Sequence, residues 1–173
     1  MEKYSRIKAL ISLDAIRYNF EQMKKNIKEG TKIIAVIKAD AYGHGAVPIA
    51  RMLEEFDYIW GFAAATAQEA LQLRRAGITR PILILGLVFE EYYKKLAEND
   101  VRMAVCDYET ARKFNKAAEE AGKKGLIHLA ADTGMTRIGF KDSEESLEEI
   151  RRIAALPNVE IEGLFTHFAR ADE

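Results

Sequence analysis

A lysine stands directly behind the first strongly apolar run of the chain. Ile33–Ile37 reads as a buried strand, and Lys38 follows it at the end where parallel α/β folds build their sites. A lysine amine held there can form an imine with an aldehyde. The alternative is an ordinary strand-end lysine that extends into solvent. Four residues later, Tyr42 offers a phenol that could bind a phosphate oxygen, and Gly43 and Gly45 give the backbone freedom for a tight turn.

Two further polar residues have no role that their positions alone assign. Arg137 follows an Asp-Thr-Gly triplet at 132–134. His167 follows the last apolar run. Taken alone, Arg137 reads as a solvated loop charge and His167 as a packed histidine. We expect His44, in a Gly-His-Gly turn, to be structural or exposed and assign it no role, and we expect His128 to serve packing. No two histidines have metal-ligand spacing, so the sequence predicts no metal site.

Short apolar runs alternate with amphipathic stretches, and these are the elements that must position the polar residues. Most of the runs are apolar throughout, which is typical of parallel strands covered on both faces. This order predicts an α/β fold of about six parallel strands with outer helices, either a partial (β/α)8 barrel of the TIM type or a smaller open sheet. An aspartic-protease interpretation of the Asp-Thr-Gly triplet is disfavoured, because it needs two carboxylates on an all-β frame. Strands are expected at 33–37, 58–62, 82–85, 101–105, 126–129 and 159–165, and helices at 12–27, 66–77, 107–122 and 143–156.

Composition limits the class of protein. The chain has 173 residues, a net charge of −1 and 49% hydrophobic residues, which predicts one packed domain over residues 1–173 and gives no electrostatic reason to bind nucleic acid or an anionic membrane. No apolar run is long enough to span a bilayer, and the first residues lack a signal-type apolar segment. The single cysteine, Cys106, excludes an intrachain disulfide and favours a reducing cytoplasm.

Several segments resemble alanine racemases, and they occur in that family's order. The segment at 36–45 (VIKADAYGHG) is similar to the family's pyridoxal-phosphate signature. The resemblance continues at 62–78 (FAAATAQEALQLRRAGI), 81–86 (PILILG), 132–139 (DTGMTRIG) and 163–173 (GLFTHFARADE). It implies an isomerase that interconverts L- and D-alanine with pyridoxal 5′-phosphate, built as a TIM-type barrel followed by a β-rich domain and used as a dimer.

The resemblance also implies a role for each candidate residue. Lys38 would hold the cofactor as an internal aldimine and act as one of two bases that exchange the α-proton. Tyr42 would bind the cofactor phosphate. Arg137 would approach the cofactor's phenolic oxygen and the substrate carboxylate, and His167 would lie against the pyridine ring. The cofactor acts as the electron sink, and the protein supplies orientation and bases.

The sequence departs from the family pattern in three ways. Ala130 stands where the family has a lysine, often carbamylated, that braces the arginine. The segment at 8–12 (KALIS) differs from the family's usual Trp-x-Glu-Ile-Asp. Six strands are expected rather than eight, so the last two barrel strands, the β domain and its catalytic tyrosine would be absent. We therefore expect a truncated or engineered barrel portion that captures cofactor with little racemisation. The alternative is a non-catalytic barrel fragment kept as a folding scaffold.

An unclosed barrel has a physical consequence of its own. Its first and last strands would each present unpaired backbone groups and an uncovered part of the core. We expect these strand edges to be relieved by homo-oligomerisation or by rearrangement of the sheet.

Overall fold

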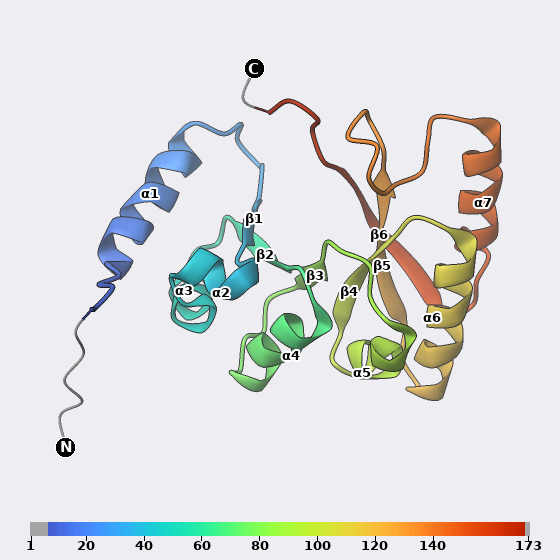
Figure 1. Ribbon diagram of the computed structural model, residues 1–173, viewed down its shortest axis with the longest axis horizontal. Helices are drawn as coiled ribbons and strands as arrows, with labels where there is room; N and C mark the ends of the chain where they lie inside the picture. The colour runs from blue at the N-terminus through green and yellow to red at the C-terminus, as the bar shows by residue number, and fades with distance from the viewer. Residues whose placement is uncertain (1–6, 172–173) are drawn as a thin grey trace.

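The computed structural model describes residues 7–171 and has the expected alternation of strands and helices (Figure 1). Six strands form one parallel sheet in the order β1-β2-β3-β4-β5-β6. The strands are β1 (Ile33–Val36), β2 (Ile59–Ala64), β3 (Ile82–Ile84), β4 (Val101–Val105), β5 (Gly125–Ala131) and β6 (Val159–Thr166). The helices are α1 (Leu13–Lys25), α2 (Lys38–Gly43), α3 (Ala46–Leu53), α4 (Ala67–Arg75), η1 (Glu90–Tyr92), α5 (Tyr93–Glu98), α6 (Tyr108–Glu120) and α7 (Glu144–Ala154).

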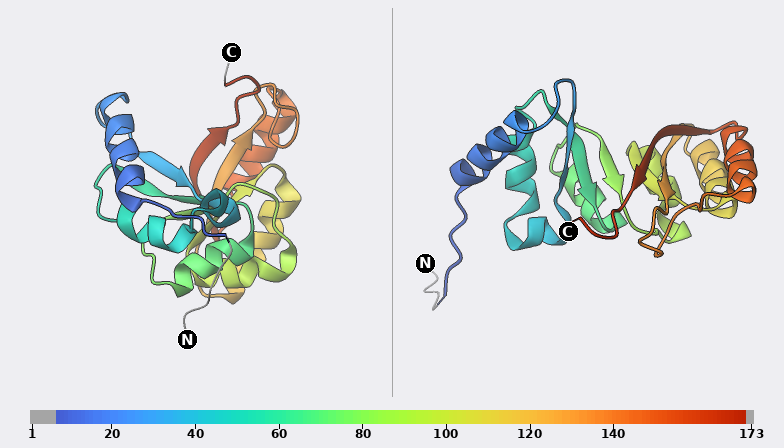
Figure 2. Two further views of the ribbon diagram at one scale, coloured as in Figure 1. Left: turned by 60° about the vertical axis from the view of Figure 1, so that its left-hand side comes forward. Right: turned by 90° about the horizontal axis from the view of Figure 1, so that it is seen from above.

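The sheet curves into a trough with its helices on the outside. Figure 2 shows β1 and β6 on opposite sides of the open concave face, while α3 to α7 cover the convex face. Because neighbouring strands twist and connect through outer helices, successive βα units build up the wall of a barrel. This arrangement confirms the prediction of a partial TIM-type barrel with about six parallel strands.

The four helices expected from the sequence begin where a capping side chain is present. Ser12, Thr66, Asp107 and Ser143 each accept a hydrogen bond from a backbone N–H in the first turn of α1, α4, α6 and α7. At Thr66 the capping box is complete, because Glu69 also accepts from the Thr66 backbone. The sequence did not single out α3, α5 or η1.

The core lies between the convex face of the sheet and the outer helices. Phe62 and Phe114 are fully buried there, together with leucines and isoleucines of β2 to β5. The expectation that the strands are covered on both faces is wrong for β1 and β6. Ile34, Val36 and Leu164 are 37%, 41% and 67% exposed, because six strands curve without closing and these side chains meet no opposite wall.

Helix α1 lies beside α3 at the β1 side of the sheet (Figure 1). Its Ile16 and Phe20 pack against the core, but none of its residues is fully buried. Arg17 adds an ion pair to Glu55 (2.9 Å) and lies over the Phe56 ring. None of the helices in the described part of the chain has the length and apolar character needed to cross a bilayer.

Candidate functional site

Lys38 and Tyr42 lie at the two ends of an unusual turn that follows β1. Residues 39–42 all have φ between 50° and 55°, so α2 is a short left-handed helix rather than a right-handed one. Left-handed backbone is costly for residues that carry a Cβ. His44 supports the turn, because its Nδ1 lies 3.0 Å from the carbonyl oxygen of Ala41. His44 thus makes a structural contact within the turn, whereas the handedness of the turn was not anticipated.

Arg137 is carried by a loop that runs from β5 towards α7. The base of this loop is closed by two backbone hydrogen bonds, from Asp132 to Phe140 and from Phe140 to Ala130. The Asp132 carboxylate accepts from the N–H groups of Gly134 (3.1 Å) and Thr136 (2.9 Å), and these bonds lower its pKa. The Asp-Thr-Gly triplet therefore braces the loop that carries Arg137.

One glycine of this loop has a strict steric role. Gly139 has φ of 129°, and a Cβ added there would lie 2.6 Å from the backbone nitrogen of Asp132. Only glycine allows the backbone at position 139 to approach the backbone at Asp132 this closely.

His167 directly follows β6. A hydrogen bond of 2.6 Å between the hydroxyls of Thr133 and Thr166 joins the end of this strand to the Arg137 loop. The segments that carry Arg137 and His167 are thus held side by side, although the two residues are far apart in the sequence.

One pocket brings together all four residues singled out from the sequence. Lys38, Tyr42, Arg137 and His167 line a cavity of about 450 Å³ at the carboxyl ends of the strands. This volume is within the range of small-molecule sites. Its other described lining residues are mostly apolar, and none is acidic: Ile34, Val36, Ala63, Leu83, Leu85, His128, Ala130, Ala131, Ile138, Gly163, Leu164, Phe165 and Thr166.

The four polar side chains have no protein partner. Within residues 7–171, no hydrogen bond or ion pair involves the side chains of Lys38, Tyr42, Arg137 or His167. Two cations, a phenol and an imidazole therefore line an otherwise mostly apolar pocket and are available to a ligand. This arrangement suits a planar anionic ligand. In the same part of the chain, no group of three or more His, Cys, Asp or Glu side chains is placed to hold a metal ion.

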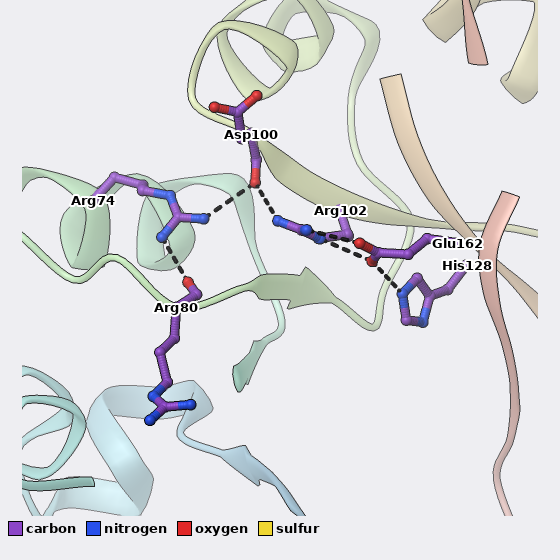
Figure 3. Close-up of polar contacts among 6 residues, drawn as sticks. All are labelled: Arg74, Arg80, Asp100, Arg102, His128 and Glu162. Carbon is purple, nitrogen blue, oxygen red and sulfur yellow. Dashed lines mark hydrogen bonds and ion pairs between the residues drawn. The ribbon is translucent and has the colours of Figure 1, made fainter. Parts of the chain in front are cut away.

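A charged cluster lies inside the barrel beside this pocket, and sequence reasoning missed it. Figure 3 shows its residues. Arg102 of β4 makes a bidentate ion pair with Glu162 of β6, with N–O distances of 2.7 and 2.9 Å. Glu162 also lies 2.9 Å from Nε2 of His128, and the Trp60 ring lies near both Arg102 and His128. His128 is therefore part of a polar network and also lines the pocket, rather than serving packing alone.

The electrostatics of this cluster favour a charged Glu162. The hydrogen bonds from Arg102 lower the pKa of Glu162 most, and they outweigh the opposing effect of burial. Gly163 makes room for the network, since a Cβ there would lie 2.8 Å from the His128 ring. The signal available in the sequence was the alternation of polar residues along β6, which is unusual for a buried parallel strand.

Ala130 also lines the pocket, with only 3% of its surface exposed. Its methyl group has no donor or acceptor that could hold the Arg137 guanidinium. The brace that the resemblance associates with this position is therefore not supplied by residue 130.

Parallel βα units with a lysine-bearing pocket at the carboxyl ends of the strands define a ligand-binding domain of the TIM-barrel class. Residues 11–173 match the family described as alanine racemase, N-terminal domain, and the chain belongs to that family. The alanine racemase of Clostridium tetani is 44% identical over 165 residues, which cover 95% of this chain and 42% of that protein.

Solved structures share the fold as well as the sequence. The alanine racemase of Clostridium difficile 630 superposes with a TM-score of 0.91 at 45% identity, covering 94% of this chain and 43% of that one. A histidine racemase from Leuconostoc mesenteroides superposes with a TM-score of 0.81 at 32% identity, covering 92% and 42%. The chain thus spans less than half the length of the relatives it matches.

Proposed function

We propose that residues 1–173 form the cofactor-binding barrel portion of a pyridoxal-phosphate-dependent racemase. The observation that carries this proposal is the convergence on one pocket of Lys38, Tyr42, Arg137 and His167, whose side chains have no partner among residues 7–171. Their chemistry fits pyridoxal phosphate, which combines an aldehyde, an aromatic ring, a phenolic oxygen and a phosphate. When bound, the cofactor withdraws electrons from the α-carbon of an amino acid and so acidifies its α-proton.

Each side chain has a distinct task in this proposal. Lys38 would hold the cofactor through Nζ and would then take and return the α-proton on its own face of the substrate. Tyr42 would donate its hydroxyl to the phosphate. Arg137 would bind the phenolic oxygen and the substrate carboxylate, and His167 would lie against the ring. Racemisation also needs a base on the opposite face of the substrate. As the family resemblance implies, we assign this base to a tyrosine of the β-rich domain that follows the barrel in the family.

Alanine is the substrate we propose. The alanine racemases of Clostridium tetani and Clostridium difficile are 44% and 45% identical to this chain, whereas the histidine racemase is 32% identical. The higher identity favours L- and D-alanine, and the histidine racemase makes histidine the matched competitor. We assign the protein to the cytoplasm, where pyridoxal phosphate and free amino acids occur and where a free Cys106 stays reduced.

The direct test is covalent trapping. The chain is mixed with pyridoxal phosphate, reduced with borohydride and mapped by peptide mass. We expect the label on Lys38, with loss of the label and of the visible absorbance band in Lys38→Ala. Lys28→Ala, at an exposed lysine before β1, is the matched control and should label like the parent. A parent chain whose label is absent, or spread over surface lysines, would contradict the proposal.

A second candidate function is a non-catalytic barrel fragment. Ala130, which gives Arg137 no brace, is the observation that favours it. The test adds a separately produced C-terminal portion of a related racemase and measures D-alanine formation from L-alanine. Restored activity supports the racemase function, whereas cofactor capture without any activity supports the non-catalytic one.

We also propose that the chain self-associates through the edges of β1 and β6. Both strands have one neighbour only, and their inner side chains Ile34, Val36 and Leu164 are exposed. Light scattering should give a mass above that of a monomer. A stable monomer with fully protected edge amides would refute this proposal.

A further inference from the structure

Glu69 connects two parts of the chain that meet at the mouth of the barrel. Its carboxylate accepts from the backbone N–H groups of Ala65 (2.8 Å) and Thr66 (3.1 Å), as a helix-capping residue does. It also accepts from the N–H of Ala39 (2.7 Å), which is 30 residues away and directly follows Lys38. Capping α4 does not require this third bond.

The segment that Glu69 holds is conformationally costly. Residues 39–42 are left-handed, and each residue with a Cβ costs about 1 kcal/mol or more in that conformation. Such a turn persists only where the surroundings tie it down. Glu69 ties its first residue, and the Asp40 carboxylate ties its far end by accepting from the N–H of Ala46 at 2.7 Å.

The handedness of this turn decides where two pocket side chains lie. Lys38 precedes the left-handed residues and Tyr42 is the last of them, and both line the same cavity. Reversing the hand of residues 39–42 would reverse the sign of their backbone dihedral angles, and so would change where Tyr42 lies relative to the end of β1.

We propose that Glu69 is a positioning residue, whose carboxylate holds the left-handed turn so that Lys38 and Tyr42 face one bound cofactor together. This inference rests on the proposed function only for the identity of the ligand. The hydrogen bond to Ala39 and its effect on the turn are properties of the chain itself.

Glu69 is charged at neutral pH. Burial raises its pKa, but the backbone hydrogen bonds from Ala65, Ala39 and Thr66 outweigh this and hold the pKa below the ordinary value of 4.5. A charged acceptor makes stronger hydrogen bonds than a neutral one, which suits a group that must hold a strained turn.

The chain offers a matched control at the opposite end of the sheet. Glu54 also gathers three donors, namely the N–H and hydroxyl of Thr79 (2.7 and 2.9 Å) and the N–H of Arg80 (3.0 Å). It lies near the start of β3 and does not line the pocket. Loss of Glu54 should therefore cost stability as loss of Glu69 does, without touching the turn.

The experiment compares Glu69→Ala with Glu54→Ala, and adds Glu69→Gln in case the alanine variant fails to fold. The first readout needs no cofactor. Hydrogen exchange at the Ala39 amide should accelerate about tenfold or more in Glu69→Ala, since an exposed amide loses its only acceptor. The acceleration should be smaller in Glu69→Gln, whose amide keeps one acceptor oxygen where the carboxylate has two. In the parent and in Glu54→Ala, the Ala39 amide resonance should move as pH falls and Glu69 protonates. The Glu69 variants should lack this movement.

The second readout is binding of pyridoxal phosphate, with Lys38 labelling as its check. We expect the dissociation constant to rise about tenfold in the Glu69 variants, which corresponds to about 1.4 kcal/mol, and to stay near the parent value in Glu54→Ala. Equal weakening in both would show a general loss of stability and overturn the inference, as would unchanged exchange at Ala39. If the parent chain does not label Lys38 at all, the proposed function fails, and the Ala39 amide alone decides whether Glu69 holds the turn.

Discussion

The two ends of the barrel sheet use positively charged residues in opposite ways. At the amino ends of the strands, Arg74 donates to the carbonyl oxygens of Asn99, Ile78, Arg80 and Asp100, at distances of 2.7 to 3.1 Å. Figure 3 shows the bonds to Arg80 and Asp100. At the carboxyl ends, Lys38 and Arg137 have no partner among the described residues.

Arg80 behaves like Arg74, because its guanidinium donates to the carbonyl oxygens of Glu54, Phe56 and Ile59. The carbonyls of Glu54 and Phe56 lie between α3 and β2, and that of Ile59 belongs to the first residue of β2, so the guanidinium donates where the chain passes from helix to strand. The cations at this end therefore close the fold. The cations at the other end have no partner among the described residues and are available to a ligand, as the proposed function requires.

The largest effect expected from this comparison is the loss of a structural arginine. Arg80→Ala removes the guanidinium donor from the carbonyl oxygens of Glu54, Phe56 and Ile59, and we expect it to lower the free energy of unfolding by about 3 kcal/mol. Urea unfolding measures this. The control is Arg75→Ala, an exposed neighbour on α4, which should change stability by less than about 0.5 kcal/mol. If both variants changed the free energy of unfolding by similar amounts, the arginines at the amino ends of the strands would have no special structural role.

The next largest loss of stability is expected in the cluster of Arg102, His128 and Glu162 inside the barrel. Glu162→Gln leaves the Arg102 guanidinium, whose side chain is only 12% exposed, without its negative partner. We expect a loss of about 2 kcal/mol in urea unfolding. Glu160→Gln, two residues earlier on β6 and exposed, is the matched control and should be nearly neutral. A neutral Glu162→Gln would mean that water replaces the ion pair at no cost.

A smaller effect is expected in acid, and it involves both ends. Burial raises the pKa of Glu54 and of Glu69, but backbone hydrogen bonds outweigh it and hold both pKa values below 4.5. Groups with a lowered folded pKa contribute stability that is present above the ordinary value and is lost as pH falls through the folded value. Stability should therefore fall below about pH 4.5. Glu54→Gln and Glu69→Gln should each flatten that fall, and a profile unchanged in both variants would contradict this assignment.

The smallest effect on stability is expected at the pocket, at the carboxyl ends of the strands. Arg137→Ala removes an exposed side chain without a protein partner, so the free energy of unfolding should change by less than about 0.5 kcal/mol. The same variant should bind pyridoxal phosphate more weakly, as measured by the visible absorbance in a titration. A clear loss of stability would place Arg137 with Arg74 and Arg80 as a structural residue.

Much of the architecture was accessible from local patterns. The stretches expected as helices at 12–27, 66–77, 107–122 and 143–156 each contain an observed helix, and the apolar runs marked all six strands. The four proposed site residues were accessible for a different reason. Lys38 follows a strand end and the other three lie in segments that resemble a known family, so recognition did not depend on their contacts.

The amino-acid sequence by itself determined the order of strands and helices, because helix caps and hydrophobic periodicity act over a few residues. The tertiary structure alone decided the left-handed turn, the bond from Ala39 to Glu69, and the cluster of Arg102, His128 and Glu162. The bond from Ala39 to Glu69 and the contacts within the cluster join residues 30 to 60 positions apart. Their energies depend on buried charges and on strained backbone that the folded chain brings together. A local sequence pattern does not show which distant donor will bind which acceptor.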